Sequence, residues 1–235
     1  VRNGAESPRI FSIGPDARNV DGVSMDRSLK PLDVVYGSAM GVDRQRVLRN
    51  TYALLALSMV PTVLGAWLGL ALGFSFFAGS PLIAVGLFLA ISFGFFFGIE
   101  KYKNSGVGVL LLLGFTFFMG LMLSRLLGMA LHLSNGAQLI SLAFGGTGLV
   151  FVSMAAWAQA TKRDVSNMGK WLMVGAVVIM VAAIASIWLQ MPALHLAISA
   201  MAVLVFSVFI MYDLKRIMDG GETNYVTATL AIYLD

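Results

Sequence analysis

Two aspartates near the carboxyl end of the chain are the residues best placed to do chemistry. Asp213 lies near the end of one apolar run, and Asp235 lies inside the next. An ionised aspartate at the centre of a membrane helix costs roughly 2.5–3.5 kcal/mol on insertion scales, so such residues usually face a partner or a watery cavity. Two neighbouring carboxyl groups in a poorly solvated site cannot both ionise cheaply, so we expect them to titrate as a unit. Protonated, they can hydrogen-bond to each other and close a path; deprotonated, they offer the hard oxygen ligands that Ca²⁺ prefers.

An alternative interpretation gives these aspartates no functional role. Asp213 would then pair with Lys215 or Arg216 or lie at the membrane interface, and Asp235 would cap a helix or extend its side chain to the interface. The two interpretations differ in whether the carboxyl groups face each other.

Three other ionisable residues are candidates for gating or secondary roles. Arg125 lies near the end of an apolar run, where a side chain that extends to the interface is the ordinary interpretation and a gating ion pair is the alternative. His195 lies beside Pro192 at the start of a run, as a packed interfacial histidine or as a pH sensor. Glu100 and Lys101 end a run, where we expect a solvated ion pair, with a latch towards the aspartates as the alternative.

The elements that must position these residues are membrane helices. Of the 235 residues, 58% are hydrophobic and only 12% are charged, whereas soluble domains are nearly half apolar and a quarter charged. Six apolar runs reach the roughly 20 residues that a spanning helix needs, and they cover residues 52–73, 81–99, 107–131, 137–159, 170–190 and 193–212.

Residues 225–235 form about half of a seventh run. The sequence therefore predicts an all-α integral membrane protein, a seven-helix bundle whose seventh helix is truncated in this chain. A spanning segment that stops at mid-bilayer would leave backbone carbonyls unpaired, so we expect further sequence after Asp235.

The connection between the last two helices brings the chain back on itself. Gly220 and Gly221 tolerate the left-handed conformation that follows a helix end. Thr223 or Asn224 can cap the helix that follows.

This short connection predicts where the two aspartates lie. A helix that ends near Met218 places Asp213 roughly 8 Å inside it, at 1.5 Å per residue. A helix that starts at residues 225–227 places Asp235 roughly 12–15 Å from its own start. Because the two helices are antiparallel neighbours, we expect the carboxyl groups at similar depth.

The basic residues predict the orientation. One set of connections and flanks carries ten lysines and arginines, and the opposite set offers only Arg125. The ten are Arg44, Arg46, Arg49, Lys101, Lys103, Lys162, Arg163, Lys170, Lys215 and Arg216. This asymmetry places the amino terminus in the cytoplasm. Because the basic residues lie at the ends of apolar runs and not in one patch, the net charge of +4 does not indicate nucleic-acid binding.

Two regions follow from this pattern. Residues 1–50 read as a polar, largely disordered cytoplasmic tail with a helical segment near residues 42–50, and residues 51–235 read as the membrane bundle. Within the bundle, spaced glycines form small-residue stripes that we expect to pack between helices, and they give only a weak indication of a dimer. The glycines are Gly65, Gly69 and Gly73 in one run and Gly94 and Gly98 in the next.

Catalytic and cofactor sites find little support. Gly73-Phe74-Ser75 matches the Gly-x-Ser pattern of a serine nucleophile, but three residues match easily by chance and these lie at a helix end. No histidine and glutamate have the H-E-x-x-H spacing of a zinc site, and the chain has no cysteine. We expect neither an enzyme nor a resident cofactor, with Ca²⁺ as transported ion.

Several segments resemble the BAX inhibitor-1 family, also called the transmembrane BAX inhibitor motif family. They are VLRNTYALLALSM (47–59), FGGTGLVF (144–151), TKRDVSNMG (161–169), MYDLKRI (211–217) and GGETNY with AIYLD (220–235). LQMPALHLAISA (189–200) with GGETNY resembles its proteobacterial branch, which includes a modulator of the FtsH membrane protease. The resemblance covers roughly residues 45–235 and implies that homology starts near Met25, which would make residues 1–24 an upstream extension.

The resemblance implies two functions that differ. Several members of the family are described as pH-sensitive Ca²⁺ leak channels with an aspartate pair in the sixth and seventh helices, and that motif maps onto Asp213 and Asp235. The branch resemblance implies protease regulation in the bacterial inner membrane, with an FtsH-type protease as partner in addition to the lipid bilayer. Members of that branch can lack one or both aspartates. This chain keeps both, so the ion pathway is the preferred hypothesis.

A third class of function is a binding module. The tail that carries Arg44, Arg46 and Arg49 would then be a handle for a protease, because an exposed disordered end is where pulling on a membrane protein begins.

Overall fold

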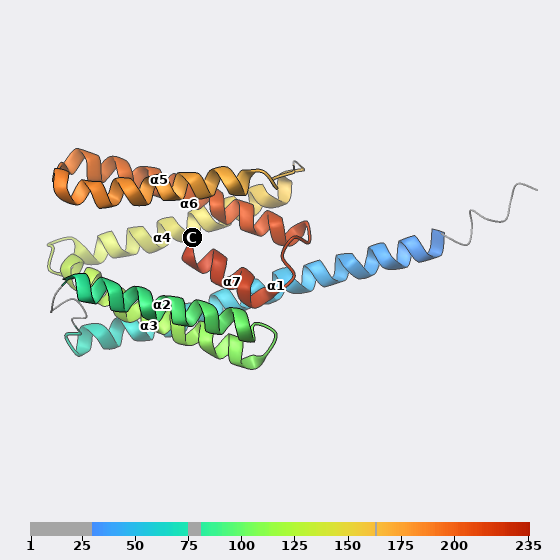
Figure 1. Cartoon of the computed structure of the whole chain (residues 1–235), viewed down its shortest axis with the longest axis horizontal. Helices are drawn as coiled ribbons and strands as arrows, with labels where there is room; N and C mark the ends of the chain where they lie inside the picture. The colour runs from blue at the N-terminus through green and yellow to red at the C-terminus, as the bar shows by residue number, and fades with distance from the viewer. Residues whose placement is uncertain (1–29, 75–80, 163) are drawn as a thin grey trace, which may run out of the picture. The chain divides into compact units, whose positions relative to one another are not determined.

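The computed structural model describes residues 30–74, 81–162 and 164–235 (Figure 1). The chain divides before Val42, and the bundle lies in the unit formed by residues 42–235. Seven α-helices are found in the described ranges. They are α1 (Lys30–Ala71), α2 (Pro81–Tyr102), α3 (Gly106–Leu131), α4 (Gly136–Ala160), α5 (Met168–Leu189), α6 (Pro192–Met218) and α7 (Tyr225–Leu234).

Six of these described helices are long and apolar enough to cross a membrane, and α7 adds a shorter apolar helix of ten residues. The all-α, seven-helix fold class is therefore confirmed. Residues 1–29 of the expected tail lie outside the described residues. The expected helical segment near residues 42–50 is longer than we predicted, because α1 begins at Lys30. Pro31 does not prevent this start, since proline is tolerated in the first turn of a helix.

Two exposed tryptophans mark the ends of the apolar part of α5. Trp171 is 78% exposed and Trp188 is 76% exposed. They lie about 26 Å apart along the helix, close to the roughly 30 Å thickness of a bilayer's hydrocarbon core. Because tryptophan is enriched at both membrane interfaces, we infer that α5 spans the bilayer between these two residues.

Helices α1 and α3 approach closely at glycines. A Cβ atom at Gly120 of α3 would overlap the carbonyl oxygen of Thr62 on α1, and one at Gly65 of α1 would overlap the carbonyl oxygen of Phe117 on α3. Gly69 lies against Ser124 in the same way. The backbones can approach this far only because the side chains are absent, which is the usual role of small residues between membrane helices.

Only one of the other three glycines that we expected to pack between helices contacts a neighbouring helix. Gly98 lies against Leu111 of α3, whereas Gly73 and Gly94 have open space where a Cβ would lie. The predicted packing role is therefore wrong for those two, because sequence spacing gives a stripe without saying which neighbour covers it.

Helix α7 contributes residues to two hydrophobic clusters. Val226, Leu230 and Tyr233, spaced at i, i+4 and i+7, belong to a cluster with residues of α1, α2 and α3. Ala228 and Ile232 belong to the other cluster, with residues of α1, α4, α5 and α6. Both faces of this short helix are therefore covered, and α7 connects the two halves of the bundle.

Asp164 forms local hydrogen bonds just before α5. Asp164 accepts hydrogen bonds from the backbone N–H and the hydroxyl of Ser166, and these bonds hold the pKa of the Asp164 carboxyl below its usual range. Between these two residues, Val165 is buried. The turn therefore fixes the chain that leads into α5.

We expect Gly120→Ala to destabilise the bundle by about 1–3 kcal/mol, because the new methyl group must displace the backbone of α1. Gly145→Ala on α4 is the matched control, since a Cβ there has open space and alanine favours a helix over glycine by about 0.5–1 kcal/mol. Thermal unfolding of both variants in detergent measures the difference. Equal midpoints for the two variants would contradict the close approach of α1 and α3.

Candidate functional site

Asp213 belongs to the buried stripe of α6. Ile210, Leu214 and Ile217 of this helix are buried in the core, and Asp213 lies three residues after the first of them. Because residues three and four apart share one face of a helix, Asp213 lies at the edge of the face that packs against the rest of the bundle. Helix α6 packs against α4, α5 and α7.

Asp235 lies on the face of α7 that looks towards α6. Ala228 and Ile232 pack in the cluster that contains the buried residues of α6, and Asp235 follows them at the same helical spacing. Its side chain is therefore directed to α6 and not to α2 and α3.

The two carboxyl groups meet. The side chains of Asp213 and Asp235 lie within interaction range of each other, so the structure brings together the two residues that the sequence singled out. A hydrogen bond between two carboxyl groups requires a shared proton, because a carboxylate has no hydrogen to donate. The Oδ2 atom of Asp235 is buried and has no protein hydrogen-bond partner. We call Asp213 and Asp235 the carboxyl pair.

The turn that returns Asp235 to α6 depends on Gly220. Helix α6 ends in a Schellman arrangement, in which the Gly220 N–H donates to the carbonyl of Ile217 and the Gly221 N–H donates to that of Arg216. Gly220 has φ +81°, which is the left-handed region predicted for it. A Cβ atom there would also lie 2.8 Å from Nε of Arg44, whose guanidinium covers the turn.

A side chain of the same connection starts α7. Oδ1 of Asn224 accepts hydrogen bonds from the backbone N–H groups of Val226 (2.9 Å) and Thr227 (3.2 Å). Of the two expected caps, Asn224 is therefore the residue that caps the helix, and it satisfies two donors at its open end.

An ion pair lies beside the carboxyl pair. Nη2 of Arg216 is 3.7 Å from Oε2 of Glu222, and these two residues line a cavity of about 10 Å³ together with Asp213. A cavity of this size has room for about one water molecule. The charged groups that act on Asp213 are Asp235, Arg216 and Glu222.

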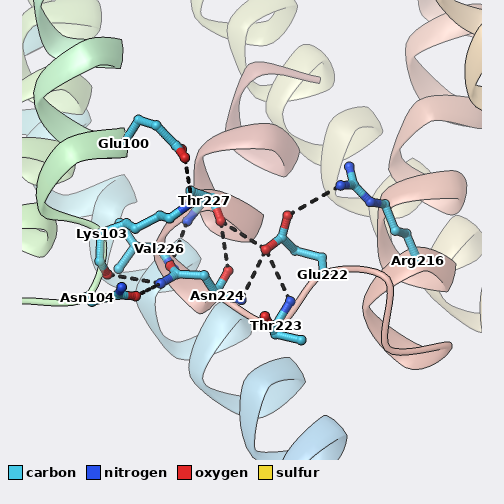
Figure 2. Close-up of polar contacts among 9 residues, drawn as sticks. All are labelled: Glu100, Lys103, Asn104, Arg216, Glu222, Thr223, Asn224, Val226 and Thr227. Atoms are coloured by element: carbon cyan, nitrogen blue, oxygen red, sulfur yellow. Dashed lines mark hydrogen bonds and ion pairs between the residues drawn. The ribbon is translucent and has the colours of Figure 1, made fainter.

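Glu222 is the member of the site that the sequence reasoning missed. It lies in the connection, where an acid reads as an ordinary solvated residue. Its Oε1 accepts hydrogen bonds from the N–H of Thr223 (3.1 Å), the N–H of Asn224 (3.0 Å) and the hydroxyl of Thr227 (3.1 Å), as Figure 2 shows. Glu222 lies within the GGETNY segment (220–225), which resembles a family motif. That resemblance was the signal in the sequence that could have identified it.

The basic residues after Asp213 make their salt bridges elsewhere. Lys215 pairs with Asp219 at 2.9 Å, and Arg216 pairs with Glu222. The alternative in which Lys215 or Arg216 neutralises Asp213 as a direct salt-bridge partner is not what the structure shows. The side chain that acts most strongly on Asp213 is instead the other acid.

The secondary candidates lie away from the carboxyl pair. Arg125 is exposed and lies about 28 Å along α3 from the start of that helix. His195 contacts Oγ of Ser186 at 3.3 Å and lies about 27 Å along α6 from Asp213. Glu100 is paired with Lys103, not with Lys101 as expected, and its side chain is exposed.

The tryptophans of α5 give a reference for the depth of Asp213. Helices α5 and α6 are antiparallel, because Gly169 near the start of α5 lies against Tyr212 and Ser186 near its end contacts His195. Asp213 therefore lies at about the same depth in the bundle as the start of α5, where Trp171 is found. We infer that the pair lies inside the interface that Trp171 marks and not at the bilayer centre.

The connections at this end of the bundle contact one another. Asn224 binds Lys103 and Asn104 between α2 and α3, and Val165 and Ser166 line one cavity of about 320 Å³ with Asp219 and Gly221. We call this the basic end, because the lysines and arginines of these connections lie here.

Comparison with known proteins decides the family. The family described as "Inhibitor of apoptosis-promoting Bax1" matches residues 44–235. The chain belongs to the BAX inhibitor family. This match confirms the resemblance seen in the sequence, and it includes both members of the carboxyl pair and the turn between them.

Individual relatives narrow the position within the BAX inhibitor family. An uncharacterised protein of Neisseria meningitidis is 40% identical over 86% of this chain and 90% of its own length. An uncharacterised membrane protein of Vibrio cholerae is 37% identical over 83% of this chain and 85% of its own. The modulator of FtsH protease YccA of Escherichia coli is 38% identical over 80% of this chain and 83% of its own. The chain is therefore a bacterial-type membrane protein of this family.

We expect Gly220→Ala to weaken the α6–α7 turn, because an L-residue in the left-handed region costs about 1–2 kcal/mol and its methyl group would press on Arg44. Gly221→Ala is the control, since it meets mainly the flexible side chain of Arg216. The unfolding midpoints of the two variants in detergent give the comparison. A turn that tolerates both substitutions equally would show that Gly220 does not set its geometry.

Proposed function

We propose that this membrane protein is a pH-sensitive cation leak pathway, that its cargo is Ca²⁺, and that the carboxyl pair gates it. The observation that carries the proposal is the direct contact of two acids on adjoining apolar helices. An acid within a membrane span usually serves an ion or proton path. This chain supplies two such acids, and each has the other as its partner.

The gate follows from the chemistry of two carboxyl groups. With one shared proton, Asp213 and Asp235 hydrogen-bond and hold α6 and α7 together. When that proton leaves, two like charges repel each other at short range in a poorly solvated site. A divalent cation relieves the repulsion, because carboxylate oxygens are the ligands that Ca²⁺ takes.

The oxygen ligands of the carboxyl pair suit a Ca²⁺ ion that passes through better than one that is held tightly. Two carboxylates supply at most four oxygens, whereas Ca²⁺ takes six to eight. Within the described part of the chain, no three acidic or histidine side chains converge as a metal-ligand group. The ion would therefore keep part of its water and leave readily.

The basic end is proposed to face the cytoplasm. The connections and adjoining helix ends that carry Lys101 and Lys103, Lys162 and Lys170, and Lys215 and Arg216 lie at this end. An excess of lysine and arginine is typical of cytoplasmic loops. In this orientation the carboxyl pair lies near the cytoplasmic interface of a bacterial inner membrane.

In liposomes loaded with a Ca²⁺ indicator, we expect flux through the wild-type protein to rise as the pH rises through the titration of the pair. Asp213→Asn and Asp235→Asn should flatten this dependence across roughly pH 5–8, since an amide does not ionise. Asp219→Asn is the matched control, because Asp219 is exposed and pairs with Lys215. Variants of the pair that keep the wild-type pH profile would remove the proposal.

A second function is favoured by one relative, the Escherichia coli protein named as a modulator of FtsH protease. We propose as the alternative that this chain binds an FtsH-type protease and alters its action on membrane proteins, with no transport. The amino-terminal region would supply the contact, because Arg44, Arg46 and Arg49 at the start of the bundle are adjacent to it.

Deletion of residues 1–40 separates the two functions. We expect it to change the protease-linked turnover of a membrane substrate in cells, while Ca²⁺ flux in liposomes stays at the wild-type level. Loss of flux without a change in turnover would contradict the assignment of that region to the protease. Changed turnover together with wild-type flux that still depends on the carboxyl pair would show that both roles coexist.

A further inference from the structure

Asn224 makes two sets of hydrogen bonds with opposite ends of its amide. The oxygen caps α7 through the N–H groups of Val226 and Thr227. The nitrogen donates to the carbonyl oxygen of Lys103 at 3.1 Å and to Oδ1 of Asn104 at 2.8 Å. Figure 2 shows this side chain between the start of α7 and the α2–α3 connection. A cap alone needs only the oxygen, so the nitrogen contacts have another purpose.

The α2–α3 connection is itself held in place. Lys103 forms an ion pair with Glu100 one turn earlier, and Ser105 donates its hydroxyl to the carbonyl of Tyr102. Gly108 fits against the Tyr102 carbonyl with no room for a side chain. The two acceptors that Asn224 uses are therefore presented by an ordered turn, 120 residues away in the sequence.

Helix α7 transmits this anchoring to the carboxyl pair. It is a single ten-residue helix with Asn224 as its N-cap and Asp235 as its C-cap. Its middle is held to α1 by Thr229, which donates to the carbonyl of Tyr225 and lies 3.4 Å from that of Thr51. A rotation or slide of α7 at Asn224 would therefore move Asp235 relative to Asp213.

We propose that Asn224 is a positioning residue for the carboxyl pair: its amide fixes the start of α7 to the α2–α3 connection and so holds Asp235 against Asp213. This inference rests on the proposed function for its consequence, since the pair is the proposed gate. Glu222 supports the same anchoring from α6, through Arg216 on one side and Thr227 on the other. The α2–α3 connection becomes part of the gate although it touches neither acid.

Three variants separate the two roles of Asn224. Asn224→Ser keeps a good N-cap but is too short to reach the α2–α3 connection. Asn104→Ala removes one acceptor from an exposed turn and leaves α7 and its cap unchanged. Thr223→Ala is the control, because Thr223 is the exposed neighbour and contributes its backbone N–H, which the substitution keeps.

The first readout is hydrogen exchange of the two connections. We expect the amides around residues 103–105 and 224–227 to exchange roughly fivefold faster for each tethering hydrogen bond lost. The increase in exchange rate should therefore be larger for Asn224→Ser than for Asn104→Ala, and the exchange rates of Thr223→Ala should match those of the wild type. Unchanged exchange in both variants of the tether would overturn the proposal.

The second readout is the infrared absorption of the hydrogen-bonded carboxyl pair, assigned with Asp213→Asn and Asp235→Asn. We expect Asn224→Ser and Asn104→Ala to weaken or shift this band over a pH titration, in which Asp235, Arg216 and Glu222 are the charged groups that act on Asp213. Faster exchange with an unchanged band would overturn the proposal, since Asn224 would then hold loops only. A shifted band in a protein without Asp-dependent Ca²⁺ flux would uphold the positioning role and reject the proposed function.

Discussion

A carboxyl group within a membrane span must meet a partner, and this constraint organises the carboxyl end of the bundle. Asp213 meets Asp235, a second acid, while the nearby lysine and arginine are occupied by Asp219 and Glu222. Such a contact is stable only with a proton or a cation between the oxygens. The left-handed Gly220 and the Asn224 cap are the local features that fold α7 back far enough to make it.

The position of α7 extends this constraint to the whole fold. One face of α7 packs with α2 and α3 and the other with α6, so the carboxyl pair is connected to both halves of the bundle. The glycine contacts of α1 with α3 keep one half compact, and the antiparallel α5 and α6 form the other. The proposed gate between α6 and α7 would therefore move between two packed halves of the bundle. The proposal assigns two discrete states to the pair, protonated and cation-bound.

Much of this arrangement was legible in the sequence. The apolar runs predicted the six long helices, and the short connection predicted that the two aspartates approach each other. Gly220 and Gly221 predicted the turn, and the cap was predicted at Thr223 or Asn224. The start of α1 at Lys30 was missed, because glycines and polar residues interrupt the apolar residues of this segment and leave no sustained helical period in the sequence. The roles of Glu222 and of the Asn224 amide were missed for a different reason. They depend on which connections meet at the basic end, and contacts between residues 120 apart have no local pattern.

The distance between the two carboxyl carbons in a lipid bilayer tests the central claim most directly. Solid-state nuclear magnetic resonance of protein with ¹³C-labelled aspartate side chains measures it, and Asp213→Asn and Asp235→Asn assign the signal. Two hydrogen-bonded carboxyl groups place these carbons within about 5 Å of each other. A correlation at that distance, lost in either variant, is the result that the shared-proton pair predicts. Separate signals without a correlation, in protein whose helices remain intact, would contradict it.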